Sequence, residues 1–161
     1  LKTTAVDYAL QFELWMKIRN RVSDTNSAIN RIRRINLQIT ELLARDIFSK
    51  TDAAKPIAKV LEAAELLRKQ LSSIENQLTQ NQYETPSDRL RHPTMLKERM
   101  EALVSVVSVS DAAPPQQAHA VFEDLSTQID EQLAQLSKLE EQELLQLNKQ
   151  IEQAGIPKLQ G

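Results

Sequence analysis

The chain has 161 residues, of which 41% are hydrophobic and 26% are charged, a balance that is typical of a folded domain and unlike that of a disordered chain. Its net charge of −2 gives no reason to expect binding to nucleic acid or to an acidic membrane, and without cysteine it can form neither disulfides nor thiolate sites. Only two glycines occur, both near the C-terminal end. A sheet protein of this length would need glycine in many tight turns, so an all-α fold is predicted.

The first predicted helix covers residues 4–48 and carries a continuous seam of mainly apolar residues. Its members alternate between spacings of three and four residues, which averages about 3.5 and places them on one helical face, as in a coiled coil. A second column beside the seam widens the stripe to that of a helix that packs against two or more neighbours. We expect Thr25 and Asn36 to fix the register, and Trp15 to pack in the core rather than against a ligand. The seam consists of Trp15, Ile18, Val22, Thr25, Ile29, Ile32, Asn36, Ile39 and Leu43, and the second column of Leu14, Ala28, Ile35 and Leu42.

Two shorter helices are predicted next, at residues 55–82 and 93–109, with a loop of turn-forming residues between them. Pro56 belongs in the opening turn of the first of these helices, where its missing N–H does least harm. The run of residues 104–109 is β-branched and would suit a strand, but no second strand exists to pair with it. We therefore assign this run to the end of the third helix.

The fourth predicted helix, residues 115–154, follows an 11-residue rhythm instead of a seven-residue one. Such a rhythm, about 3.67 residues per turn, favours a nearly straight helix or slight right-handed winding. Glu140 is the one charged residue on the apolar stripe, and we expect it to pair with a basic neighbour rather than to act as an acid. Gly155 suits a left-handed C-cap, and Pro157 blocks continuation of the helix.

These four helices predict an elongated, mainly antiparallel four-helix bundle that forms a single domain over residues 1–161. Short connections make sequential helices antiparallel, and the two shorter helices together roughly match the length of each long one. Residues 3–47 carry a net charge of +2 and residues 113–161 a net charge of −5. The first and last helices would therefore attract one another when packed side by side.

The sequence predicts no catalytic residue, cofactor or metal site. Its only histidines, His92 and His119, fall in or beside loops, and neither has a glutamate three residues before it, as a di-iron bundle would require. No apolar run approaches the length of a membrane span. We interpret the basic cluster of Arg31, Arg33 and Arg34 as a solvated, partly ion-paired face rather than a phosphate site, because aromatic residues for base stacking are scarce.

One set of segments is distinctive: Asn30-Arg-Ile-Arg33, Arg91-His-Pro-Thr-Met-Leu96 leading to Leu103, Val106, Ser110-Asp111 and Pro114-Pro-Gln-Gln117, then Leu144-Leu-Gln-Leu-Asn148 and Ala154-Gly-Ile-Pro157. Together these segments resemble the helical C-terminal region of large bacterial proteins whose N-terminal part is a sortilin-like, BNR-repeat β-propeller, often labelled glycosyl-hydrolase-like. The resemblance covers nearly the whole chain and implies an exported parent protein, located in the periplasm, at the cell surface or outside the cell. No catalytic residue can be carried over, because the propeller itself lies outside these residues.

The expected function is that of a non-catalytic accessory domain in a larger propeller protein, acting in domain packing, assembly or partner binding. The start at Leu1, with a helical pattern almost at once, suggests the C-terminal fragment of such a parent, whose own propeller is then the expected partner. The alternative is a free-standing helical adaptor or chaperone-like scaffold that binds a helical or extended peptide. A homodimer also stays open, since a long bundle can leave an apolar strip uncovered.

Overall fold

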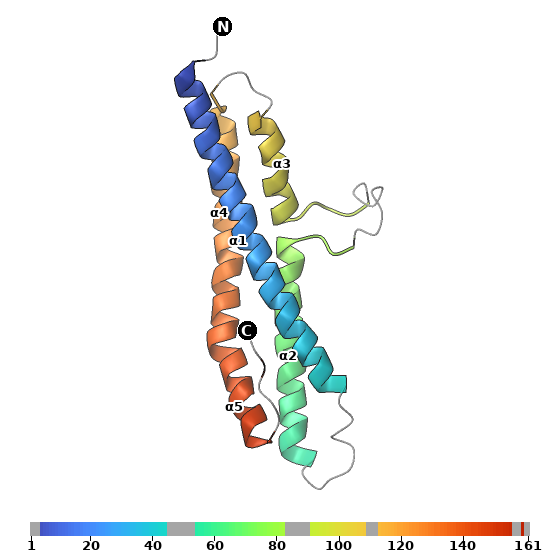
Figure 1. Ribbon diagram of the computed structural model, residues 1–161. Coiled ribbons are helices and arrows are strands. Elements are labelled where there is room, and N and C mark those ends of the chain that lie inside the picture. Colours follow the sequence, from blue (N-terminus) through green and yellow to red (C-terminus); the bar gives the residue numbers. More distant parts are fainter. Residues whose placement is uncertain (1–3, 45–53, 83–90, 109–112, 156–158, 160–161) are drawn as a thin grey trace. The chain divides into compact units, whose positions relative to one another are not determined.

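The computed structural model describes residues 4–44, 54–82, 91–108, 113–155 and 159. Within these ranges the chain is entirely helical apart from turns and short connecting segments, which confirms the all-α helical bundle expected from the sequence (Figure 1). The elements are α1 (Ala5–Ala44), α2 (Ala54–Leu78), α3 (Leu96–Ser108) and a fourth stretch made of α4 (Gln116–Lys138), a π-helical turn (Leu139–Leu144) and α5 (Leu145–Gln153).

The helix ends lie within a few residues of their predicted positions, and the β-branched run is helical through Ser108, as predicted. Residues 45–48, the expected end of the first helix, lie outside the described residues. Two ends differ by more than the others: α2 stops at Leu78 instead of residue 82, and α3 begins at Leu96 instead of Pro93.

One side chain, Glu98, accounts for both of these differences. Its Oε2 accepts a hydrogen bond from the backbone N–H of Met95 (3.2 Å), at the start of α3, as in half of a capping box. Its Oε1 accepts a bond from the hydroxyl of Thr79 (2.7 Å), and the carboxylate also accepts the backbone N–H of Gln80. The Thr79 hydroxyl and the Gln80 N–H, just beyond the end of α2, therefore have a carboxylate as their hydrogen-bond acceptor. The helix ends there because these groups no longer need partners within it.

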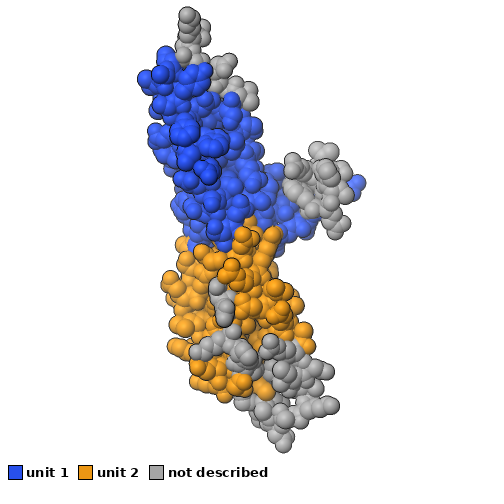
Figure 2. Space-filling view, in the orientation of Figure 1, with its two compact units in different colours: residues 1–27, 76–133 blue, residues 28–75, 134–161 orange. Residues whose placement is uncertain are grey.

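The chain divides into two compact units, residues 1–27 with 76–133 (unit 1) and residues 28–75 with 134–161 (unit 2), coloured separately in Figure 2. Unit 1 contains the first part of α1, all of α3 and most of α4. Its buried residues include Leu14, Ile18 and Thr25 of α1, Met100, Leu103 and Val107 of α3, and Phe122, Leu125 and Ile129 of α4.

Within unit 1, α1 and α4 run in the same direction and α3 runs opposite to both (Figure 1). Electrostatic interactions join Glu13 to His119 and Lys17 to Glu123, and further along both helices Arg21 and Asp130 form an ion pair of 2.6 Å. In these three pairs the residue number on α4 increases with the residue number on α1, which identifies two parallel helices. If each helix ran opposite to the one before it, the first and the fourth would be antiparallel. The parallel course of α1 and α4 in unit 1 differs from that expectation.

Unit 2 packs the second part of α1 against α2 and against the stretch that contains the π-helical turn and α5. Asn36 of α1 donates to the hydroxyl of Ser72 (3.3 Å), and Arg33, three residues earlier, pairs with Glu75, three residues later on α2 (2.6 Å). The two helices are thus antiparallel, as sequential neighbours were expected to be. The buried apolar residues are Ala28, Ile29, Ile32, Ile35, Ile39 and Leu42 of α1, Val60, Ala64, Leu67, Leu71 and Ile74 of α2, and Leu136, Leu144, Leu147, Ile151 and Leu159.

The first and last helices were expected to attract one another because their net charges are opposite, and in each unit an ion pair joins them. Arg21 of α1 pairs with Asp130 in unit 1, and Arg31 of α1 pairs with Glu140 in unit 2, at 3.1 Å. The second pair also confirms that Glu140 has a basic neighbour.

The C-terminal end of α5 has the predicted left-handed cap. Gly155 has a φ of +74°, and its N–H donates to the carbonyl of Glu152 (3.0 Å). Pro157, the predicted block to continuation, lies outside the described residues. Beyond the cap, the side-chain amide of Asn148 bonds both backbone groups of Leu159, at 3.0 and 2.7 Å, and Leu159 is buried.

Candidate docking surface

The two histidines of the sequence both lie in unit 1. His92 lies in the turn before α3, and His119 is exposed on the first turn of α4. Among the described residues, no group of three or more His, Cys, Asp or Glu side chains is arranged to hold a metal ion.

The basic cluster of α1 is partly ion-paired, as we interpreted it. Arg31 pairs with Glu140, and Arg33 pairs with Glu75, whose side chain is only 12% exposed. These arginines join helices of unit 2, and the ion pairs take up charge that a phosphate group would need.

The two polar seam residues play different parts. The hydroxyl of Thr25 is fully buried and donates to the carbonyl of Arg21 in its own helix (2.8 Å), so this hydrogen bond joins no second helix. The side-chain N–H of Asn36 bonds Ser72 across the α1–α2 contact, as a register-setting residue does, although its Oδ1 is buried without a partner among the described residues.

Trp15 lies at the edge of the core of unit 1 rather than at its centre. The inward position is taken by Leu14, which is 1% exposed, whereas Trp15 is half-buried and its ring stacks on Phe12 with centroids 6.2 Å apart. Tyr8, Phe12 and Trp15 follow one another at i, i+4 and i+7, so they share one face of α1 and form what we call the aromatic stripe. With Gln11, Val107 and Ser108 they line a groove of about 390 Å³ between α1 and the end of α3.

The aromatic stripe is largely open to solvent. Phe12 is 63% exposed and Tyr8 is 56% exposed. The surrounding turns of α1 are apolar on nearly all faces, with Val6 and Leu10 also exposed. A helix segment that is apolar all round is normally buried, and a contiguous exposed apolar patch marks an interaction site.

The two carboxylates in these turns of α1 are engaged within unit 1. Thr4 and Asp7 form a reciprocal capping box at the start of α1, and the hydrogen bonds from Thr4 lower the pKa of Asp7. The hydrogen bond from Lys17 (2.8 Å) lowers the pKa of Glu13. Asp7 and Glu13 are therefore ionised at neutral pH.

A second groove in unit 1, which we call the α3–α4 groove, has a volume of about 450 Å³. Val106 of α3 and Val121 of α4 line it and are 53% and 44% exposed. Arg99, which is exposed, also lines it. The other lining residues are Thr94, Glu98, Ala102 and Leu103 of the α3 region and Pro115, Gln117 and Ala118 of the α4 region.

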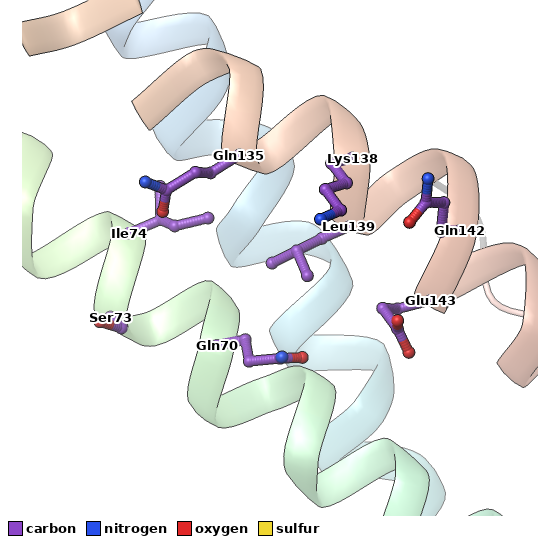
Figure 3. Close-up of a pocket in the computed structure, with 8 residues that line it drawn as sticks. All are labelled: Gln70, Ser73, Ile74, Gln135, Lys138, Leu139, Gln142 and Glu143. Atoms are coloured by element: carbon purple, nitrogen blue, oxygen red, sulfur yellow. The ribbon is translucent and has the colours of Figure 1, made fainter. Parts of the chain in front are cut away.

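Unit 2 contains a separate cleft of about 340 Å³ between α2 and the stretch around the start of the π-helical turn (Figure 3). Ile74 and Leu139 supply its apolar part, and its other lining residues are Gln70, Ser73, Gln135, Lys138, Gln142 and Glu143. Ser73 and Glu143 lie at opposite ends of the labelled set in Figure 3, so no hydroxyl is placed beside a base.

The sequence reasoning missed the aromatic stripe, although the signal was present. Nine of the twelve residues between Ala5 and Met16 are apolar, which is more than a helix with one buried face requires. The seam and the second column account only for Leu14 and Trp15 in this stretch, so the spacing left its other apolar residues unassigned.

Comparison with protein families, with curated proteins and with solved structures finds no match for this chain. In the described part of the chain, no helix is both long and apolar enough to cross a membrane.

Proposed function

We propose that this chain is a non-catalytic helical docking module, and that it serves as an accessory domain of a larger exported protein with a sortilin-like, BNR-repeat β-propeller. Its role is domain packing, assembly or partner binding. The observation that carries the docking role is the exposure of the aromatic stripe in unit 1, with Phe12 63% exposed. The propeller parent rests on the resemblance of the sequence segments.

Physical chemistry supports a protein as the occupant of this surface. Aromatic side chains are enriched at interfaces and provide most of the binding energy there, because they bury a large area with few rotatable bonds. Full burial of a side chain such as Phe12 contributes about 1.5–3 kcal/mol. The open groove beside the stripe, in contrast, would leave much of a small molecule in solvent.

The full-length coding sequence tests the proposed parent. We expect a β-propeller to be encoded upstream of Leu1. A coding sequence without one would remove the family proposal and leave the docking role to be judged by itself.

Position-specific cross-linking tests the docking role. A photoreactive phenylalanine analogue at position 12 of the full-length protein should form a covalent adduct with protein, because this position is buried in the complex. Position 37 is the matched control, since Leu37 is 60% exposed on the same helix but belongs to unit 2. Equal yields at the two positions, or no adduct at position 12, would contradict the proposal. Mass spectrometry of the joined peptides identifies the partner.

The alternative, an adaptor that binds a helical peptide, is favoured by the α3–α4 groove, because an apolar groove between two helices can receive the apolar face of a third. Titration calorimetry with an amphipathic helical peptide tests it. We expect the peptide to bind the wild-type chain and not the Val106→Glu variant. A titration of the wild-type chain that shows no heat of binding would count against the adaptor.

A further inference from the structure

The two halves of α3 differ in how strongly their sequences favour a helix. Residues 96–103 are all leucine, lysine, glutamate, arginine, methionine or alanine, which are the strongest helix formers. Residues 104–108, which we call the α3 end segment, are all valine or serine. Valine loses side-chain freedom in a helix, and serine competes with the backbone for hydrogen bonds, so both favour a helix less. The α3 end segment therefore has little helical preference of its own.

The serine hydroxyls of the α3 end segment show this competition. Ser105 donates to the carbonyl of Ala102 (2.7 Å), and Ser108 donates to the carbonyl of Val104 (2.7 Å). Hydrogen bonds of this kind, to a carbonyl of the preceding turn, slightly destabilise a helix. A helix of only 13 residues is also marginal in water by itself. The α3 end segment therefore depends for its helical state on contacts with the rest of unit 1.

Two contacts hold the α3 end segment against unit 1. The side chain of Val107 is fully buried, at 0% exposure. The side-chain amide of Gln11, on α1, donates a hydrogen bond to the carbonyl of Val107. This carbonyl is one of the last four of α3, which have no N–H partner within the helix. Gln11 therefore supplies from α1 a hydrogen bond that the end of α3 cannot make by itself.

The α3 end segment also separates two grooves of unit 1. Val107 and Ser108 line the groove beside the aromatic stripe, and Val106 lines the α3–α4 groove. If these residues left the helix, both grooves would lose a wall that they share. The two grooves would then become continuous.

We propose that the α3 end segment is a flap that opens by local unfolding while the rest of unit 1 stays folded, and that its opening joins the two grooves. The first half of α3 stays in place, because Met100 is fully buried and Glu98 holds the first turn. The hydrogen bond from Gln11 keeps the flap closed. Local openings of this kind occur in folded proteins at free energies below that of global unfolding.

Native-state hydrogen exchange, measured residue by residue by NMR, tests the flap. We expect the amides of the α3 end segment to exchange at least about tenfold faster than the amide of Ile18, in the core of unit 1, and to depend less on denaturant. Gln11→Ala should speed their exchange about fivefold, because the closed state loses a hydrogen bond. Gln38→Ala is the matched control, since Gln38 is also half-buried on α1 but belongs to unit 2, and it should leave their exchange unchanged.

Two further variants separate local opening from the unfolding of unit 1. Ile129→Val removes a methylene group from the core, and should speed exchange at Ile18 about fivefold without changing the α3 end segment, because the opening leaves Ile129 packed. The double variant Ser105→Ala, Val106→Ala strengthens the helical preference at two exposed positions. It should slow the opening about fivefold.

The chain has no cysteine, so Val107→Cys provides a single thiol as a second readout. This thiol is buried while the flap is closed, and it should react with iodoacetamide only when the flap opens. The reaction should be about fivefold faster when Gln11→Ala is added, for the same reason as the amide exchange. Circular dichroism establishes that each variant is folded.

Three results would overturn the flap. The first is exchange of the α3 end segment at the rate and with the denaturant dependence of Ile18. The second is an equal effect of Gln11→Ala and Gln38→Ala on the α3 end segment. The third is an Ile129→Val variant in which the α3 end segment and Ile18 are accelerated alike, because opening would then require the unfolding of all of unit 1.

Discussion

At the scale of single residues, a few side chains determine where helices end and how connecting segments are held. Glu98 serves the end of α2 and the start of α3, and Asn148 holds both backbone groups of Leu159. Glu98 contacts Thr79 across 19 residues of sequence and Asn148 contacts Leu159 across 11, so neither contact is visible in a local pattern. This is why the sequence located the helices well but placed the end of α2 too late.

Replacement of Glu98 by alanine should lower the free energy of unfolding by about 2 kcal/mol, because the Thr79 hydroxyl and two backbone N–H groups lose their acceptor. Glu101→Ala is the matched control. Glu101 belongs to the same helix, its side chain is 48% exposed, and its carboxylate lies as far as 4.0 Å from the ammonium group of Lys97. Its replacement should therefore lower the free energy of unfolding by less than about 0.5 kcal/mol. Chemical denaturation followed by circular dichroism measures both values. Equal losses in the two variants would show that Glu98 has no special role at this junction.

The burial pattern of α1 shows how far a residue-level prediction can reach. The two columns predicted from spacing contain most of its buried residues, including Ile18, Ile32 and Ile39 at 0% exposure. Leu14 is nevertheless the buried residue, while Trp15 is half-buried. Spacing gives the width of an apolar stripe, but its centre depends on where neighbouring helices lie, and a sequence does not state that.

At the scale of the helix, the π-helical turn resolves a conflict between two rhythms. α1 and α2 follow a seven-residue repeat, whereas the fourth stretch follows an 11-residue one, and stripes with these repeats rotate around their helices at different rates. A π-helical turn takes up one extra residue and brings Leu144, Leu147 and Ile151 back to the buried face. The rhythm was readable from the sequence, but the location of the extra residue was not.

Deletion of Glu141, an exposed residue within the π-helical turn, should therefore be tolerated, because the turn can close to regular α-helix without rotating the residues that follow. Deletion of Gln146, an exposed residue of α5, should rotate Leu147 and Ile151 by about 100° away from the core and abolish cooperative unfolding. Thermal melts of the two single-residue deletions compare them directly. Equal destabilisation would mean that the π-helical turn holds no removable residue.

At the scale of the whole molecule, composition and periodicity determine the fold class but not the direction of every helix. Glycine scarcity and four apolar stripes were sufficient to predict an all-α bundle. The parallel course of α1 and α4 in unit 1 was not predictable, because a loop's length constrains only the helices that it joins. The candidate docking surface was missed for a related reason: a stripe that faces solvent and a stripe that faces another helix have the same spacing.

The parallel pairing of α1 with α4 has its own test in the ion pair of Arg21 and Asp130. Arg21→Asp alone should destabilise the protein by up to about 1 kcal/mol, because it places a like charge beside Asp130, whose side chain is 59% exposed and well solvated. Adding Asp130→Arg should recover most of this loss, with a coupling of a few tenths of a kcal/mol in the double-mutant cycle. Arg19 lies on α1 two residues away and faces solvent, so the cycle of Arg19→Asp with Asp130→Arg should show no coupling. If unfolding measurements gave the same coupling at both arginines, the charges would be acting only through the general field of the protein, and the register of α1 against α4 in unit 1 would have lost its support.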